Sequence, residues 1–541
     1  MGRAPRGALF GIRELRRVRP GLCRWGMLAL CAALGSLSNT AFGQADAGKI
    51  PSSQELAGRV HWINTSVGIS ETYTDNVFLA PPGAQIADWV TQITPAISVV
   101  SSGPRLRLDA IYDPEIVEYA NTNRAEGVFQ RGNAIGNLEL VDDLFFIEAG
   151  AKINQYDISL LGALTTSNVN ITANRATASN SYISPYLTSN LGSFARADAR
   201  FTYSRWRSNE VAPTLPDNDA GSVDLRLTSG PAHKLLTWKV AYWLESIRYV
   251  TNQETRSEVF TTDVKRLMTP TLGLVAQAGY ESYDTGIAFP PLEGPRWRLG
   301  FEWTPSPRTL LAATAGKRLD DNAYSFEFHH RTRLTAWNAS YSEDVTTTRS
   351  QFFVPETGNT AGILDQMFIN QYPDPAQRQK AVQEFIARTG LPPSLGGPIN
   401  FFSDQLFLQK RWLLSIGMIG SRNSLIANAF WQFRKALTTG PSAVSGDFGI
   451  SDSIRMTGGN LAWSLRVTTR DTLTVEAGYT RNEFLDIDQI DDFAYYRAGL
   501  IRKLQPRLSA SLFYRRQERT STQPLSDYVE NAGVVALRMT F

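Results

Sequence analysis

Apolar and polar side chains alternate along much of this chain with a period of two residues. The pattern is clear in segments 105–112, 195–204, 272–281 and 472–480, where every second position is Leu, Ala, Val, Tyr or Phe. Successive side chains of a β-strand point to opposite faces, so this alternation predicts strands with one apolar face. Each segment is close to the roughly 9–11 residues that a tilted membrane-spanning strand needs.

The opposite faces of these segments carry charges of both signs at close spacing, as a water-filled lumen requires. A soluble all-β protein would also alternate, but it would bury the apolar face and expose the charged one. Strand length and mixed charge favour a membrane barrel, because charges inside a barrel must be hydrated or paired. The candidates to line the lumen are Arg105, Arg107, Asp109, Arg196, Asp198, Arg200, Asp224, Arg226, Arg298, Glu302, Glu476 and Arg538.

Short clusters of Gly, Pro, Asn, Asp and Ser recur between the strands and alternate with longer links. The short turns are 101–104, 141–143, 191–193, 229–231, 267–270, 305–307, 330–332, 420–423, 469–471 and 504–506. Outer-membrane barrels have short periplasmic turns and long extracellular loops. Ten turns and eleven loops predict an all-β fold, a single transmembrane antiparallel β-barrel of about 22 strands, with 20 left open.

Both ends of the chain fit a barrel of the Gram-negative outer membrane. Segment 531–541 alternates to a terminal aromatic, and we interpret Leu537, Met539 and Phe541 as the barrel-assembly signal. Residues 1–43 have a basic start, a short apolar run and small residues before a cleavage site between Gly43 and Gln44, which is typical of a secretory signal peptide. We expect a short periplasmic segment at 44–60 and the barrel at 61–541.

Removing the predicted signal peptide changes the charge and the cysteine count. Residues 1–43 hold seven arginines, no lysine and one glutamate, so the mature chain keeps 47 of the 54 basic and 50 of the 51 acidic side chains. A nucleic-acid partner loses its electrostatic support. Both cysteines, Cys23 and Cys31, leave with the signal, so no disulfide or thiol chemistry is expected.

One segment breaks the rhythm of strands and turns. The insert at 346–404 is longer than any other loop and predicts a helix at 375–389, with Asp374 as N-cap, Pro375 at the first position and Gly390 at the end. Long loops in compact proteins are usually functional. A constriction inside the lumen, a lid over its mouth and a solvent-facing decoration all stay open.

The sequence offers no site for chemistry. The four histidines are His61, His233, His329 and His330, and the last two are strand neighbours that point to opposite faces. No nucleophile elbow, phosphate loop or zinc-protease motif occurs. We predict no catalytic, cofactor-binding or metal-binding residues and no enzyme activity, with an outer-membrane hydrolase as the weakest alternative.

Three segments and the last residue carry a family resemblance. Segments 71–78, 301–310 and 478–482, together with Phe541, resemble the outer-membrane β-barrel proteins found with exopolysaccharide and PEP-CTERM gene clusters of Gram-negative bacteria. The resemblance covers most of the mature chain. It implies a role in polysaccharide synthesis or export and brings no catalytic residues with it.

The functional choice is therefore between a conduit and a structural barrel. A TonB-dependent transporter needs a plug domain before its first strand, and the 17 residues between Gln44 and His61 are too few for one. We expect a porin-like conduit for exopolysaccharide, with a scaffold barrel of an envelope polysaccharide system as the alternative. Inward-facing aromatics would favour a sugar path, and Phe513 and Tyr324 are the candidates. Expected partners are outer-membrane lipid, lipopolysaccharide, the barrel-assembly machinery and polysaccharide export components.

Overall fold

The computed structural model describes residues 60–541, apart from 123–126, 210–216, 252, 287–290, 320, 354–359, 393–394, 396–400 and 438–445. The predicted signal peptide, its cleavage site at Gly43 and Gln44, and the 44–59 part of the expected periplasmic segment lie outside the described residues.

The described chain is built almost entirely of β-strands. The first half contains β1 (Val60–Thr74), β2 (Asp88–Ser102), β3 (Leu106–Tyr112), β4 (Glu115–Tyr119), β5 (Gly127–Phe129), β6 (Gly132–Val141), β7 (Phe145–Asp157), β8 (Arg175–Leu191), β9 (Ala195–Ser208), β10 (Asn218–Ser229), β11 (Leu236–Tyr249) and β12 (Glu254–Leu267). The second half contains β13 (Leu272–Asp284), β14 (Leu292–Ser306), β15 (Thr309–Arg318), β16 (Asp321–Arg331), β17 (Thr335–Thr347), β18 (Leu406–Ile419), β19 (Asn423–Ala436), β20 (Ser453–Arg466), β21 (Asp471–Phe484), β22 (Gln489–Gln505), β23 (Leu508–Ser521) and β24 (Tyr528–Thr540). The helices are α1 (Thr348–Phe353), α2 (Thr360–Phe368), α3 (Pro375–Thr389) and the 3₁₀ turn η1 (Gly446–Gly449).

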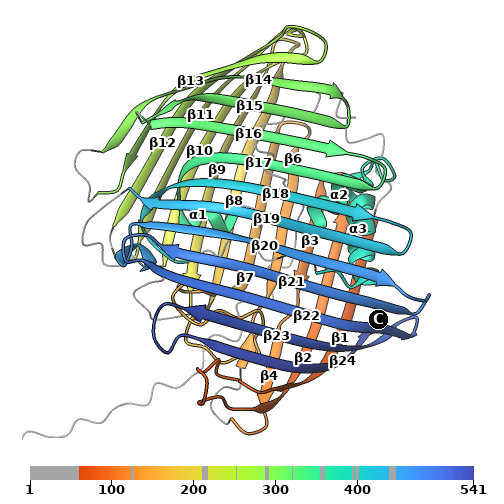
Figure 1. Ribbon diagram of the computed structural model, residues 1–541. Coiled ribbons are helices and arrows are strands. Elements are labelled where there is room, and N and C mark those ends of the chain that lie inside the picture. Colours follow the sequence, from red (N-terminus) through yellow and green to blue (C-terminus); the bar gives the residue numbers. More distant parts are fainter. Residues whose placement is uncertain are drawn as a thin grey trace, which may run out of the picture. The chain divides into compact units, whose positions relative to one another are not determined.

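The strands form one closed antiparallel barrel (Figure 1). Neighbours in sequence pair with each other, and β24 returns to pair with β1 from Ser66 opposite Thr540 to Thr74 opposite Ala532. The 24 segments make 22 crossings, because β3 with β4 and β5 with β6 each form one interrupted crossing beside β2 and β7. The first interruption falls at Pro114, which has no N–H to donate to the ladder.

The ten predicted turns all join consecutive barrel strands at one end of the barrel, and the eleven other links, most of them longer, join the strands at the opposite end. The prediction of 22 strands is therefore confirmed, and the alternative of 20 is wrong. By the rule that outer-membrane barrels keep their short turns in the periplasm, the turn end is periplasmic and the loop end extracellular. The start of β1 and the end of β24 both lie at the periplasmic end.

The two strand faces differ as the alternation predicts. In β24, Val535, Leu537 and Met539 are exposed on the outer face, while Glu530 and Ala532 are buried on the inner face. Closing the barrel pairs the first strand with the last, and an apolar outer face suits a lipid environment. No described helix is both long enough and apolar enough to span a bilayer.

Apolar cores form inside the barrel, and residues of loops and helices contribute to them together with strand residues. One core joins α2 and α3 to inward-facing residues of β17, β19 and β20: Ile363, Leu364, Val382, Phe385, Leu391 and Leu395 meet Ala336, Ile426 and Ala462. A second core at the extracellular end gathers Leu160, Phe401, Phe407, Phe430, Phe448 and Phe484 with smaller residues. Loops that enter the lumen, rather than the wall alone, therefore provide much of the buried interior.

The strands of the wall are incompletely paired at one place. β16 pairs with β17 only from Phe326 opposite Tyr341 to Arg331 opposite Ala336, whereas β17 pairs with β18 along its whole length. Residues 321–325 of β16 have β15 as their only strand partner. The extracellular part of β17 bends inward instead, and its Glu343 carbonyl accepts hydrogen bonds from Arg318 and Arg298. This bend starts the insert on its way into the lumen.

Candidate functional site

The predicted lumen residues lie mostly on the inner strand face. Strand register and the exposed apolar residues on the opposite face put Arg107, Asp109, Arg196, Asp198, Arg200, Asp224, Arg226, Arg298, Glu302, Glu476 and Arg538 on the inner side of β3, β9, β10, β14, β21 and β24. Arg105 differs, because it lies in the turn before β3 and pairs there with Asp142 of the next turn at 2.8 Å.

Most of these inner charges have a partner of opposite sign. Arg196 lies 3.1 Å from Asp198, Arg226 pairs with Asp224, and Glu476 lies 3.5 Å from Arg497. Such partly exposed pairs contribute little to stability, typically about 0–1 kcal/mol each. They keep the inner wall polar and close to neutral along β9, β10 and β21.

One inner group combines charge with aromatic rings. Arg200 lies 3.3 Å from the buried Glu148 and stacks 4.1 Å from the Tyr186 ring, whose other neighbour is the parallel ring of Phe146. Tyr182 donates a hydrogen bond to the same glutamate at 3.0 Å. Of the two aromatic residues expected to face the lumen, Phe513 does so beneath Arg497, but the prediction for Tyr324 is wrong. Tyr324 lies opposite Ala315 on the outer face and is 47% exposed.

The insert between β17 and β18 spans 348–405, within two residues of the limits set from the sequence. Its long helix α3 covers the range expected from its caps: Asp374 accepts a hydrogen bond from the Gln377 N–H, and Gly390 ends the helix with φ 68°. The left-handed conformation of Gly390 is accessible to glycine at little cost. The shorter helices α1 and α2 were not expected from the sequence.

The insert folds into the lumen. α2 and α3 pack on inward-facing residues near the periplasmic ends of β17, β19 and β20, beside the end of the barrel where the chain terminates (Figure 1). The Ser464 hydroxyl of β20 donates to the Thr389 carbonyl of α3 at 2.6 Å, and Arg331, the last residue of β16, donates to the Gln366 carbonyl of α2. Of the three positions that the sequence left open for the insert, the structure shows the one inside the lumen.

Both limbs of the insert also cross the lumen near its extracellular end. In the first limb, Arg349 of α1 pairs with Glu245 of β11 at 3.0 Å and contacts Ser204 of β9. In the second limb, Phe402 packs against Trp206 of β9 and Tyr156 of β7. Strands β9 and β18 are separated by about half of the barrel circumference in the strand order, so these contacts bridge opposite walls.

A second loop closes the extracellular mouth, and the sequence did not reveal it. The 158–174 loop between β7 and β8 is rich in Asn, Thr and Ser, a composition that reads as a solvated link. In the fold its Leu164, Asn168, Val169 and Asn170 are buried. Arg519 of β23 donates to the loop carbonyls at positions 161 and 162 at 2.8 and 2.7 Å.

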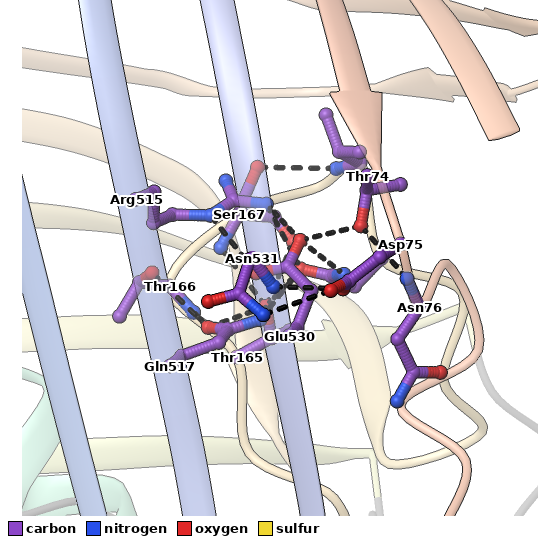
Figure 2. Close-up of polar contacts among 12 residues, drawn as sticks. Thr74, Asp75, Asn76, Thr165, Thr166, Ser167, Arg515, Gln517, Glu530 and Asn531 are labelled. Atoms are coloured by element: carbon purple, nitrogen blue, oxygen red, sulfur yellow. Dashed lines mark hydrogen bonds and ion pairs between the residues drawn. The ribbon is translucent and has the colours of Figure 1, made fainter. Parts of the chain in front are cut away.

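Figure 2 shows the polar latch that holds this loop to the barrel wall. Glu530 of β24, which is 0% exposed, accepts hydrogen bonds from Thr74 at 2.8 Å, from Arg515 at 2.6 Å and from Asn170 of the loop at 3.2 Å. Gln517 of β23 donates to Asn170 at 2.8 Å. A buried carboxylate with this many donors is stable only while the donors stay in place.

Asp447 of η1 ties a third extracellular segment to the same loop. Its carboxylate accepts from the Ser159 hydroxyl and, at 2.7 Å, from the Leu160 N–H. Burial raises the pKa of Asp447 to about 6, although the Ser159 and Leu160 hydrogen bonds and the charge of Arg434 act in the opposite direction. The contact joins the β7–β8 side of the mouth to the β19–β20 side.

The described residues offer little for catalysis. His329 hydrogen-bonds Glu327 and Asn338, and His330 contacts Thr309, both near the periplasmic end of β16. In the described part of the chain no group of three or more His, Cys, Asp or Glu side chains is arranged to hold a metal ion. The absence of enzyme activity stays a prediction.

Comparison with known proteins gives structural likenesses only. No family model matches the chain, and no curated protein matches it. The solved siderophore receptor PiuA from Acinetobacter baumannii aligns with 88% of this chain and 82% of its own at 10% identity and a TM-score of 0.44. The ferric-catecholate import receptor Fiu from E. coli K12 aligns with 88% and 81% at 10% identity and 0.46, and the siderophore receptor PirA from Pseudomonas aeruginosa with 88% and 80% at 9% and 0.42.

The closed ladder of 22 strands, its apolar outer face and its polar inner face define the class of protein: this is an integral β-barrel of the Gram-negative outer membrane. Within that class, the chain is a barrel whose lumen is entered by an internal insert and by the 158–174 loop. The resemblance to barrels of exopolysaccharide gene clusters stays a prediction.

Proposed function

We propose that this protein is a gated conduit of the outer membrane. The observation that carries the proposal is the insert inside the lumen, set against a polar wall of mixed charge. A hydrated polar solute can follow such a wall, because its charges are already paired or hydrated and attract neither sign strongly. The insert then serves as the gate.

The way in which the insert is attached supports movement. Its helical part contacts β16–β20 through one apolar cluster and a few hydrogen bonds, and the described strands continue their ladder without it. Loop and lid elements of this kind come from the less stable parts of a fold. Displacing α2 and α3 therefore breaks no strand pairing.

The proposed cargo is an exopolysaccharide in the course of export. The support is the family resemblance of segments 71–78, 301–310 and 478–482 together with the polar inner wall. Long polar chains need a wide path, and a 22-strand barrel is wide enough to leave one when internal segments move aside. Polysaccharide export components and the barrel-assembly machinery are the proposed partners.

A scaffold barrel without transport is the second candidate. The aromatic core at the extracellular end favours it, because Leu160, Phe401 and Phe448 come from three different loops and pack in one buried cluster with Phe407 of β18. A barrel filled in this way for stability alone would never open.

Planar-bilayer recording of the purified protein separates the two candidates. In the test variant, residues 354–400, which contain α2 and α3, are replaced by a ten-residue Gly-Ser linker, which reaches up to about 33 Å. In a matched control, Gln523, Pro524 and Leu525 of an exposed extracellular loop are replaced by Gly-Ser-Gly, since Leu525 is 86% exposed. Heat-modifiable migration confirms folding of all three proteins.

We expect the insert variant to conduct with larger single-channel steps than the native and control proteins. If all three fold and none conducts, the conduit is wrong and the scaffold replaces it. If all three conduct equally, the barrel is a pore but the insert is not its gate.

A further inference from the structure

Arginines outnumber carboxylates in one part of the inner wall, formed by β13, β14, β15, β17 and β18. Four guanidinium groups, those of Arg296, Arg298, Arg318 and Arg411, face two carboxylates, those of Glu281 and Asp344. Elsewhere on the wall several charges lie in one-to-one pairs, such as Arg196 with Asp198 and Arg226 with Asp224. Four guanidinium groups to two carboxylates is therefore a local excess of positive charge at this part of the wall.

Two of the four arginines are bound by the same buried glutamate. Glu281, which is 0% exposed, binds Arg318 at 2.7 Å and Arg296 at 3.2 Å, and Tyr283 also accepts a hydrogen bond from Arg318. This buried group is structural, because its ion pairs tie together the extracellular ends of β13, β14 and β15.

Neither of the other two arginines forms an ion pair with an acidic side chain in the described part of the chain, although both feel the charge of the nearby Asp344. Arg298 makes one long hydrogen bond, 3.4 Å from its Nη2 to the Glu343 carbonyl oxygen. Arg411 makes no hydrogen bond or ion pair with any described residue, although it is partly buried. A guanidinium group has five N–H donors and keeps its charge, so each of these side chains retains most of its donors for another acceptor.

The inward bend of β17 brings the two free arginines to one place. Arg411 lies opposite Ser342 in the β17–β18 ladder, and the next residue along β17, Glu343, is the one whose carbonyl Arg298 contacts. Asp344 follows, 3.7 Å from Arg318, and its side chain is 59% exposed, so the place is open to water. The bend of β17, where it is unpaired with β16, therefore places two arginine side chains near each other inside the lumen.

We propose that Arg298 and Arg411 form an anion-binding station for a solute that carries carboxylate or phosphate groups. Each of the two guanidinium groups, which come from different strands, can bind a carboxylate or phosphate through two parallel N–H donors. This bidentate geometry is the one in which arginine binds oxyanions best. Asp344 beside them keeps the net charge moderate, which permits release as well as binding. If the barrel conducts as proposed above, the station names the class of cargo as anionic.

Calorimetric titration tests the station without requiring conduction. The probes are trigalacturonic acid, inorganic phosphate and, as a neutral sugar of equal length, maltotriose. The proteins are the native chain, Arg298→Gln, Arg411→Gln, the double variant, and Arg107→Gln as the control. Arg107 is also an inward-facing arginine without an acidic partner in the described residues, but it lies near the periplasmic end of β3.

We expect both anionic probes to bind and maltotriose not to bind. Each single variant should lower the affinity for the anionic probes by about tenfold or more, equal to about 1.4 kcal/mol, because a charge-assisted hydrogen bond is lost. The double variant should abolish binding, and Arg107→Gln should stay within twofold of native. Affinity should also fall as salt rises, since the station is open to water.

The outcomes of the titration decide the proposal. Binding of trigalacturonic acid but not phosphate would support the station and restrict it to acidic sugars, and the reverse would support it for phosphate groups. Equal binding of maltotriose, equal losses in Arg107→Gln and Arg411→Gln, or no anion binding by either the native chain or the insert variant with 354–400 replaced would overturn it.

The bilayer measurement keeps the two proposals apart. Anion binding in a protein that never conducts leaves the station standing and refutes the conduit. Conduction without anion binding does the reverse. Where both hold, the chloride-to-potassium permeability ratio of the insert variant should fall when Arg298 and Arg411 are both replaced by glutamine.

Discussion

Replacing Glu530 by glutamine should loosen the latch of the 158–174 loop. The native carboxylate is 0% exposed and accepts hydrogen bonds from Thr74, Arg515 and Asn170 within 3.3 Å. The amide removes the charge and replaces one acceptor oxygen by a donor. Arg515, whose side chain is only 9% exposed, then stays buried without its counter-ion.

The size of the effect follows from this burial. Breaking a buried ion pair by removing one partner costs about 3–5 kcal/mol. The amide oxygen of glutamine still accepts one hydrogen bond from Arg515, so we expect the lower end, about 3 kcal/mol. At about 1.4 kcal/mol per factor of ten, the loop should open about a hundred times more often.

Hydrogen exchange of the folded protein in detergent measures this opening. The reporters are peptides that contain the backbone bonds from Ile171 to the Val77 carbonyl and from Ile158 to the Asn174 carbonyl. As a control, Glu118→Gln changes an exposed carboxylate of β4 and should shift exchange by less than about twofold.

The double variant Arg515→Gln/Glu530→Gln should recover part of the protection, because no lone charge then stays buried. Exchange in Glu530→Gln that matches the control would refute the latch. Faster exchange spread evenly over all strands would also refute it, because the loss would then be one of global stability.

Three further predictions concern other parts of the barrel. Because the pKa of Asp447 is raised to about 6 from 3.8, the closed mouth binds its proton more tightly than the open one. The contact should therefore be most stable below about pH 4 and weaken as pH rises through 6, and Asp447→Asn should remove this dependence in hydrogen exchange corrected for intrinsic rates. Gly417→Val should displace α2 and raise bilayer conductance, because a Cβ there would lie 2.4 Å from Ile363, whereas Gly533→Val, with nothing within 4 Å, should leave conductance unchanged. Phe541→Asp should lower the yield of heat-modifiable barrel in outer-membrane fractions, since the residue closes the ladder onto β1 and is 58% exposed on the outer face; an unchanged yield would show that assembly does not depend on it.

The barrel itself could be predicted because its signals are local. Strand faces follow from a period of two, and the turns follow from Gly, Pro, Asn and Asp, whose backbone preferences act within a few residues. The same holds for α3, whose ends are fixed by Asp374 and Gly390. The break at Pro114 was missed although it is local, because the flanking segments continue to alternate.

The occupied lumen could not be predicted because its partners are distant in sequence. Asn170 of the 158–174 loop meets Glu530, 360 residues away, and nothing near Asn170 indicates that contact. A polar loop is ordinarily solvated, and here it is buried only because β23 and β24 supply matching donors and acceptors. The excess of arginine near Glu343 is equally hidden, since it depends on the bend of β17.

The insert leaves from β17 and returns to β18, and these two strands are neighbours paired from end to end. Its two limbs therefore emerge side by side, and the chain between them enters the barrel as a doubled-back finger with no free end to thread. Assembly of the wall can finish before the finger goes in, and the finger can come out again without a knot or a broken seam. If the insert is the gate proposed above, it can therefore open and close repeatedly during the life of one folded molecule.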